Sequence, residues 1–133
     1  MSITYWIQRA DFRSDEFDAV SEANAQQALK EHDWPAELDY MDELEAAGTE
    51  TCPPGIGFVS DDGRILHICP ERNGRAMMHY HFTSSWRLLW LIPMSGEGLQ
   101  TRDDMPFAEA GKLLSNFFAN DHDRLIRYAE AKG

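Results

Sequence analysis

The sequence predicts a single α+β domain over residues 1–133, in which an antiparallel β-meander of about four to five strands packs with N-terminal acidic helices and a C-terminal helix. Three observations support this fold class. The length suits one domain with one core. Short β-rich runs separated by turn residues fill the middle of the chain. Apolar residues recur at helical spacing towards both ends.

The first elements are expected to be a strand and a long helix. Ile3–Gln8 is rich in β-branched and aromatic residues and predicts a strand. Ser14 stands before Asp15 and Glu16, and acidic residues suit the positive end of a helix. These residues predict a helix that starts near Ser14 and ends at about Lys30.

A second, shorter helix is expected next. Trp34-Pro35 should break the first helix, because the residue before a proline is pushed out of the α region. Ala36–Ala47 then predicts a helix that ends at Gly48, the usual residue after a helix C-terminus. Its apolar residues recur every three positions, at Leu38, Met41 and Leu44.

The middle of the chain predicts the meander. Its four short strands are Gly57–Ser60, Arg64–Cys69, Ala76–Thr83 and Trp86–Ile92. The residues between them, Asp61-Asp62-Gly63, Asn73-Gly74 and Ser84-Ser85, suit tight turns. Ser95–Gly98 is glycine-rich and is also expected to be a turn. It does not fit a phosphate-binding loop, because it lacks the lysine of that motif.

The C-terminal part predicts one clear helix. Pro106 stands at a first-turn position, directly after Asp103 and Asp104. The tail, Arg124–Ala129, fits either a helix or a final strand, and the sequence leaves this open.

Negative charge is concentrated in the first half. Thirteen of the 23 acidic residues lie between Asp11 and Glu50, where Arg13 and Lys30 are the only basic ones. The local net charge is therefore −11, the formal value for the whole chain. Such a field attracts basic proteins and repels nucleic acid and anionic membranes.

The location expected from the sequence is the cytoplasm. The opening residues lack the apolar run of a signal peptide, and the longest apolar stretch, Leu88–Pro93, is far too short to span a membrane. Two cysteines, Cys52 and Cys69, are too few for a disulfide framework.

The histidines could form a metal site only under one condition. His79 and His81 share a strand face, and His67 lies on the preceding strand. A two-residue turn at Asn73-Gly74 would pair His67 with Tyr80 and turn it away from the other two, whereas a three-residue loop would bring all three together. We favour half-buried sheet histidines, and expect no metal, no cofactor and no enzymatic activity, since no catalytic signature is present.

The acidic helix is interpreted as a docking surface for a basic protein. Asp39, Asp42 and Glu43 fall on one helical face, where a solvated surface is the simplest alternative. Aromatic residues among charges are typical of interfaces. The predicted partner-binding residues are Trp34, Glu37, Asp39, Tyr40, Asp42, Glu43 and Glu45.

The C-terminal part resembles the immunity proteins of bacterial polymorphic toxin and secreted effector systems. The resemblance lies in Met105–Ala110, Leu113-Leu114, Phe117-Phe118 and Leu125–Tyr128, which follow a paired strand region. One such family ends in a Pro-led helix with Ala and Phe and a short segment with Trp, whose place Tyr128 takes here. The resemblance implies an α+β inhibitor that covers the active-site region of a cognate toxin.

Two alternatives remain from the sequence. One is an acidic nucleic-acid mimic or regulator of another basic protein. The other is a small metal-binding enzyme that uses His67, His79, His81 and Cys69. The oligomeric state, monomer or dimer, also stays open, because Trp86, Trp90 and Leu91 fit either a core or a dimer interface.

Overall fold

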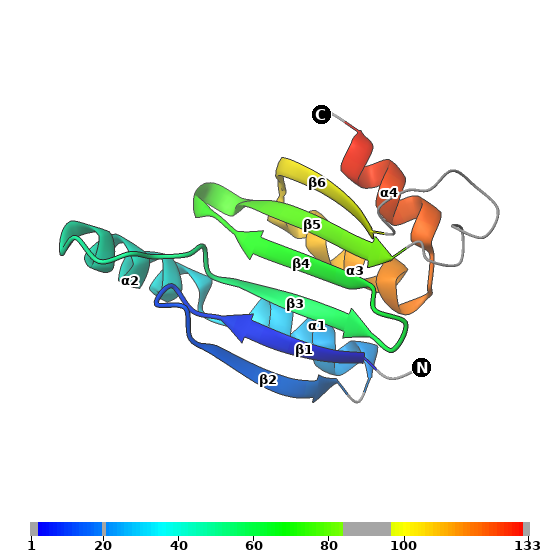
Figure 1. Cartoon of the computed structure of the whole chain (residues 1–133), viewed down its shortest axis with the longest axis horizontal. Coiled ribbons are helices and arrows are strands. Elements are labelled where there is room, and N and C mark those ends of the chain that lie inside the picture. Colours follow the sequence, from blue (N-terminus) through cyan, green and yellow to red (C-terminus); the bar gives the residue numbers. More distant parts are fainter. Residues whose placement is uncertain (1–2, 20, 84–96, 132–133) are drawn as a thin grey trace.

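A computed structural model describes residues 3–19, 21–83 and 97–131. It confirms the α+β class: one antiparallel sheet in the order β2-β1-β3-β4-β5-β6, with helices on one side (Figure 1). The described strands number six, slightly more than expected. The elements are β1 Ile3–Gln8, β2 Ser14–Ala19, α1 Glu22–Glu31, α2 Trp34–Ala46, β3 Gly55–Ser60, β4 Ile65–Pro70, β5 Arg75–Thr83, β6 Glu97–Pro106, α3 Ala110–Phe118 and α4 His122–Glu130.

The expected helix from Ser14 to Lys30 is wrong in its first part, because Ser14–Ala19 forms β2. This segment pairs antiparallel with β1 along its whole length, and Phe17 stacks on Tyr5 with ring centroids 5.1 Å apart. Cross-strand pairing of this kind outweighs a local helix signal. The true helix cap is Ser21, whose hydroxyl accepts a hydrogen bond from the Asn24 amide.

The second helix begins two residues earlier than expected. The chain does leave the α conformation between α1 and α2, but α2 starts at Trp34, and Pro35 occupies its first turn. Asp33 caps α2 by accepting a hydrogen bond from the Ala36 amide. At the other end Gly48 has a φ of 76°, as expected for a residue that follows a helix C-terminus.

The region before α3 also differs from the expectation. Pro106 ends the strand β6, Asp103 and Asp104 lie within that strand, and α3 starts only at Ala110 after one 3₁₀ turn, Phe107–Glu109. The predicted turn Ser95–Gly98 is contradicted at its last two residues, which begin β6. The predicted strand Trp86–Ile92 and the turn Ser84-Ser85 lie outside the described residues. The tail is a helix, α4.

The hydrophobic core lies between one face of the sheet and the helices α1, α3 and α4; Figure 1 shows α1 and α3 behind the strands and α4 beside β6. Alternate residues of β3, β4 and β5 point into it, as the two-residue period of a strand requires. Its fully buried large side chains are Leu29, Ile56, Phe58, Leu66, Ile68, Met78, Tyr80, Met105, Leu113, Leu114, Phe117 and Leu125. No described helix covers the opposite face of the sheet. That face, the outer edge of β2 and most of α2 are therefore surfaces on which a binding or catalytic site can lie.

The turn between β1 and β2 yields a test of the fold. Phe12 has a φ of 71°, a left-handed conformation that strains the backbone of a residue with a Cβ. The residue is also 57% exposed, so burial of its ring offsets little of that strain. We expect Phe12→Gly to raise the free energy of unfolding by about 0.5–1 kcal/mol in urea denaturation. Phe12→Ala is the control, because it removes the same ring but keeps the strained Cβ; an equal gain in both variants would contradict the strain.

Candidate functional site

The acidic part of the sequence forms one side of the molecule. Residues 11–50 supply β2, α1 and α2, which occupy the lower edge and the left-hand end in Figure 1. The strands β4, β5 and β6 and the helices α3 and α4 lie on the other side, where the acidic and basic residues of the sequence balance. The charge segregation seen in the sequence is therefore also a segregation in space.

The acidic residues of α2 are of two kinds. Asp39 and Asp42 both pair with the guanidinium of Arg72, at 2.9 and 2.5 Å, although their side chains are 67% and 62% exposed. Arg72 belongs to the turn between β4 and β5, so this contact ties α2 to the sheet. Glu43 and Glu45 are exposed and have no cationic partner among the described residues. These two carboxylates are available to a partner.

Two residues of the predicted docking surface are buried. Trp34 is 5% exposed, and its indole N–H donates a hydrogen bond to the carbonyl oxygen of Leu29 at 2.8 Å. Glu37 is 7% exposed, and its carboxylate contacts Arg9 at 3.1 Å and His32 at 2.7 Å. Neither side chain protrudes from the surface as an anchor for a partner.

The other five predicted residues do lie on the accessible side of α2. Asp39, Asp42, Glu43 and Glu45 are exposed, and Tyr40 is half-buried. The Tyr40 hydroxyl donates a hydrogen bond to Asp11 at 3.2 Å, which links α2 to the turn after β1. From here on, the acidic surface means Asp39, Tyr40, Asp42, Glu43 and Glu45.

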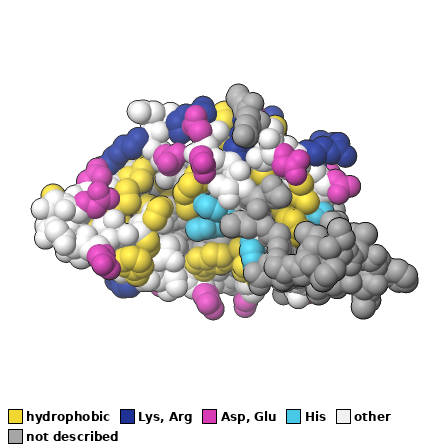
Figure 2. Space-filling view, turned by 45° about the horizontal axis from the view of Figure 1, so that its top comes forward, with side chains coloured by type: hydrophobic (Ala, Val, Ile, Leu, Met, Phe, Trp, Pro, Cys, Tyr) yellow, Lys and Arg dark blue, Asp and Glu magenta, His cyan; other side chains and the backbone are white. Residues whose placement is uncertain are grey.

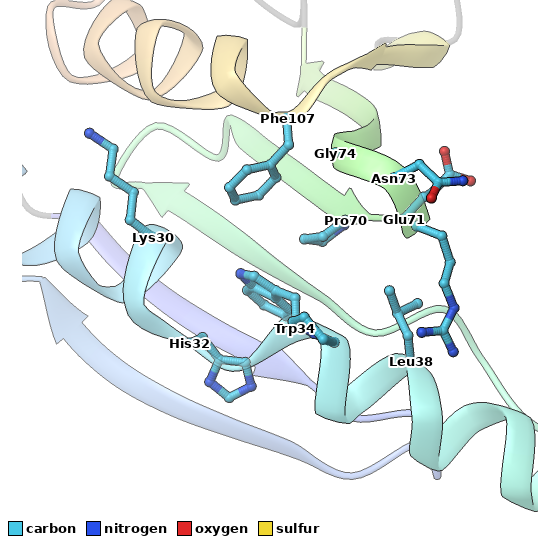
Figure 3. A pocket seen from close by; sticks show the side chains of 11 residues that line it. Lys30, His32, Trp34, Leu38, Pro70, Glu71, Asn73, Gly74 and Phe107 are labelled. Carbon is cyan, nitrogen blue, oxygen red and sulfur yellow. The ribbon is translucent and has the colours of Figure 1, made fainter.

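A pocket of about 340 Å³ adjoins this surface (Figure 3). Trp34 and Phe107 face the same space from opposite sides, and Pro70 and Leu38 close one end. Lys30 stands at the opposite end. Trp34 is therefore a wall of a pocket, not a protruding anchor. Sequence reasoning missed the pocket because it is formed by segments far apart in the chain.

The three sheet histidines share one face, which is the outcome expected for a three-residue loop and not for a two-residue turn. The Glu71 amide donates to the Arg75 carbonyl at 2.8 Å, so the loop between β4 and β5 has three residues, Arg72–Gly74. As the conditional argument required, this loop places His67 directly opposite His79.

Three rings form a row across this face of the sheet. Trp6 on β1 lies over Gly57, where a side chain would collide with the indole. The ring centroids of Trp6 and His67 are 5.6 Å apart, and those of His67 and His79 are 5.9 Å apart. In the space-filling view, histidine side chains lie among hydrophobic ones (Figure 2). A shallow hollow of about 530 Å³ contains this row.

Two groups in the hollow, His67 and Cys69, are not activated for catalysis. Burial, with a smaller effect of the nearby His79, lowers the pKa of His67 to about 4, so its imidazole is neutral at pH 7. Burial raises the pKa of the Cys69 thiol to about 12, and a thiol must ionise to act as a nucleophile. Within the part of the chain that the structure describes, no three His, Cys, Asp or Glu side chains are grouped closely enough to hold a metal ion.

Comparisons with protein-family models, with curated proteins and with solved structures found no match. Among the described helices, none combines the length and apolar composition that crossing a membrane requires. The assignment of the candidate site therefore rests on the geometry and charge of this chain.

The lowered pKa of His67 makes a prediction about acid stability. A histidine titrates near 6.5 in an unfolded chain and at about 4 here, so the unfolded state binds the extra proton between these values. Stability should be complete above about pH 6.5 and should fall by about 2–3 kcal/mol towards pH 4 through this residue. His67→Gln should flatten that fall in urea denaturation at several pH values. His81→Gln, on the same face, is the control, and equal flattening in both variants would exclude His67 as the cause.

The two thiols should differ in reactivity. Cys69 is buried and its pKa is about 12, whereas Cys52 is partly exposed. We expect a thiol-specific alkylating reagent at pH 8 to modify Cys52 first and Cys69 only when the protein unfolds. Peptide mass spectrometry over time, with and without urea, measures this order. Rapid modification of Cys69 in the folded protein would contradict the burial of its thiol.

Proposed function

We propose that the protein is a cytoplasmic binding protein of the immunity type, which neutralises a cognate bacterial toxin or effector by covering its active-site region. The observation that carries this proposal is the segregation of charge. The net charge of residues 11–50 equals the −11 of the whole chain, and those residues lie together on one side of the molecule. A basic toxin domain complements this side.

The acidic surface on α2 supports the proposal because it is held in place. Arg72 bridges Asp39 and Asp42, and Tyr40 bonds to Asp11, so α2 is tied to the body of the protein at two points. A surface that is ordered before binding loses less conformational entropy on association. Fixed charges also raise the rate of encounter with a partner of opposite sign.

The neighbouring pocket supplies apolar contact area, which charge alone does not provide. Interfaces combine a desolvated apolar centre with a charged rim, and most of the affinity comes from the centre. Here the apolar walls are Trp34, Phe107, Pro70 and Leu38, and the acidic surface begins on the next turn of α2. The two features together describe one contact area for a basic protein.

Affinity capture followed by a toxicity assay tests the proposal. Tagged protein is incubated with lysate of its source cell, and retained proteins are identified by mass spectrometry. We expect a protein with a basic domain, whose expression alone arrests growth and whose co-expression with this protein does not. A captured partner that stays fully toxic on co-expression would overturn the proposal. A basic partner with no toxicity would instead favour the acidic regulator.

Charge reversal on α2 should slow the association. In Glu43→Lys/Glu45→Lys the contacts of Asp39 and Asp42 with Arg72 remain, and of the two changed carboxylates only that of Glu45 loses a contact, an exposed 3.4 Å hydrogen bond from Thr51. We expect the association rate with the basic partner to fall about tenfold at low salt, and its salt dependence to weaken. Stopped-flow kinetics at several salt concentrations measure both.

The matched control for that variant is Asp103→Lys/Glu130→Lys. It changes the net charge equally, but at exposed positions on β6 and α4, in the balanced part of the chain. An equal loss of rate in the two variants would show that overall charge, and not the acidic surface, governs the encounter.

A further inference from the structure

We infer that the outer edge of β2 is a second contact for the same partner, at which an extended basic segment of that partner adds to the sheet as a strand. This inference rests on the proposed function in one respect, that the partner is a basic protein. It adds where that partner binds and in which conformation.

Among the described strands, none pairs with the outer edge of β2. β2 ends the strand order, with β1 on its inner side through six residue pairs. No described strand lies on its outer side, as Figure 1 shows. The side chains of residues 14–18 are all exposed. Alternate backbone amides and carbonyls of β2 are therefore free for another strand, which is the requirement for strand addition.

The side chains of β2 offer both apolar contact and charge. Phe17 stacks on Tyr5 but remains 42% exposed, and Phe12 in the preceding turn is 57% exposed. These two are the large hydrophobic side chains that the described residues expose most. Glu16 lies opposite Trp6 and therefore on the other face of the sheet from Phe17.

Charge selects the kind of strand that can pair. Asp15 contacts Arg9 at 3.2 Å, whereas Glu16 and Asp18 have no cationic partner among the described residues. A strand with Lys or Arg at alternate positions would place cations opposite these carboxylates. A second copy of β2 would place carboxylates opposite carboxylates, which destabilises a strand pair. The acidic edge thus resists self-pairing and accepts a basic strand.

Hydrogen exchange with a defined peptide tests the inference. The probe is a capped hexapeptide of alternating Lys and Val, added at millimolar concentration to the ¹⁵N-labelled full chain. At about 90% occupancy, an amide that exchanges only in the free protein slows about tenfold. We expect this slowing at alternate residues of β2, whose outward amides the peptide would bond.

Two control peptides separate strand addition from simple attraction. In the first, Glu replaces Lys, and we expect no slowing. In the second, alternate backbone nitrogens of the Lys and Val peptide are methylated, which keeps its charge but removes its hydrogen-bond donors. The inference is overturned if the methylated peptide slows β2 as much as its parent, or if the parent slows nothing.

Protein variants separate this inference from the proposed function. Glu16→Lys/Asp18→Lys should abolish the slowing by the peptide, and Glu43→Lys/Glu45→Lys should preserve it. The same amides are then followed in the complex with a captured toxin. Neutralisation of the toxin without slowing at β2 would overturn strand addition and leave the proposed function intact. Slowing at β2 by a captured protein that stays toxic would overturn the proposed function instead.

Discussion

The burial of one face of the sheet beneath α1, α3 and α4 is the constraint on which the rest of the structure depends. Successive side chains of β3, β4 and β5 point to opposite faces of the sheet. Those that point towards the helices form the core, and the side chains between them lie on the other face. Arg64, a charged side chain that reaches core residues, is paired with Asp62 and bonds to Tyr80, because an unpaired buried ion is costly. Most acidic side chains therefore lie at the periphery, and ten of the 23 belong to β2, α1 and α2.

The helix α2 depends on this core least and on polar contacts most. It extends past the end of the sheet in Figure 1, and its buried side chains are Trp34, Glu37 and Leu38, near its first turn. Buried Glu37 meets Arg9 and His32, and farther along Arg72 meets two aspartates. Removing one partner of a buried ion pair costs more stability than the pair contributes, because the other charge is left buried and unpaired. The contacts of Glu37 with Arg9 and His32 therefore hold the start of α2 in one position. The exposed contacts of Arg72 contribute less each.

Local signals predicted the fold where pairing partners are near in sequence, and failed where they are distant. Turn residues and alternation located β3, β4 and β5 to within two residues at either end. β2 was taken for a helix because Ser14 and its acidic neighbours imitate a helix start, whereas its conformation comes from pairing with β1. β6 was missed because it is polar and is defined by pairing with β5. Trp34 shares a pocket with Phe107, more than seventy residues away, and no local pattern encodes that juxtaposition.

The position of charge, more than its amount, supports a binding role for this protein. None of the described acidic residues lines the hollow around the ring row, where His67 stays unprotonated and Cys69 keeps its proton at pH 7. A partner that settled only in that hollow would gain nothing from a basic surface. The carboxylates instead follow an open strand edge and a projecting helix, two elements that meet a partner through backbone hydrogen bonds and through side chains respectively. A basic protein that contacts both would be fixed in orientation as well as attracted, and such a fixed orientation is what covering an active site requires.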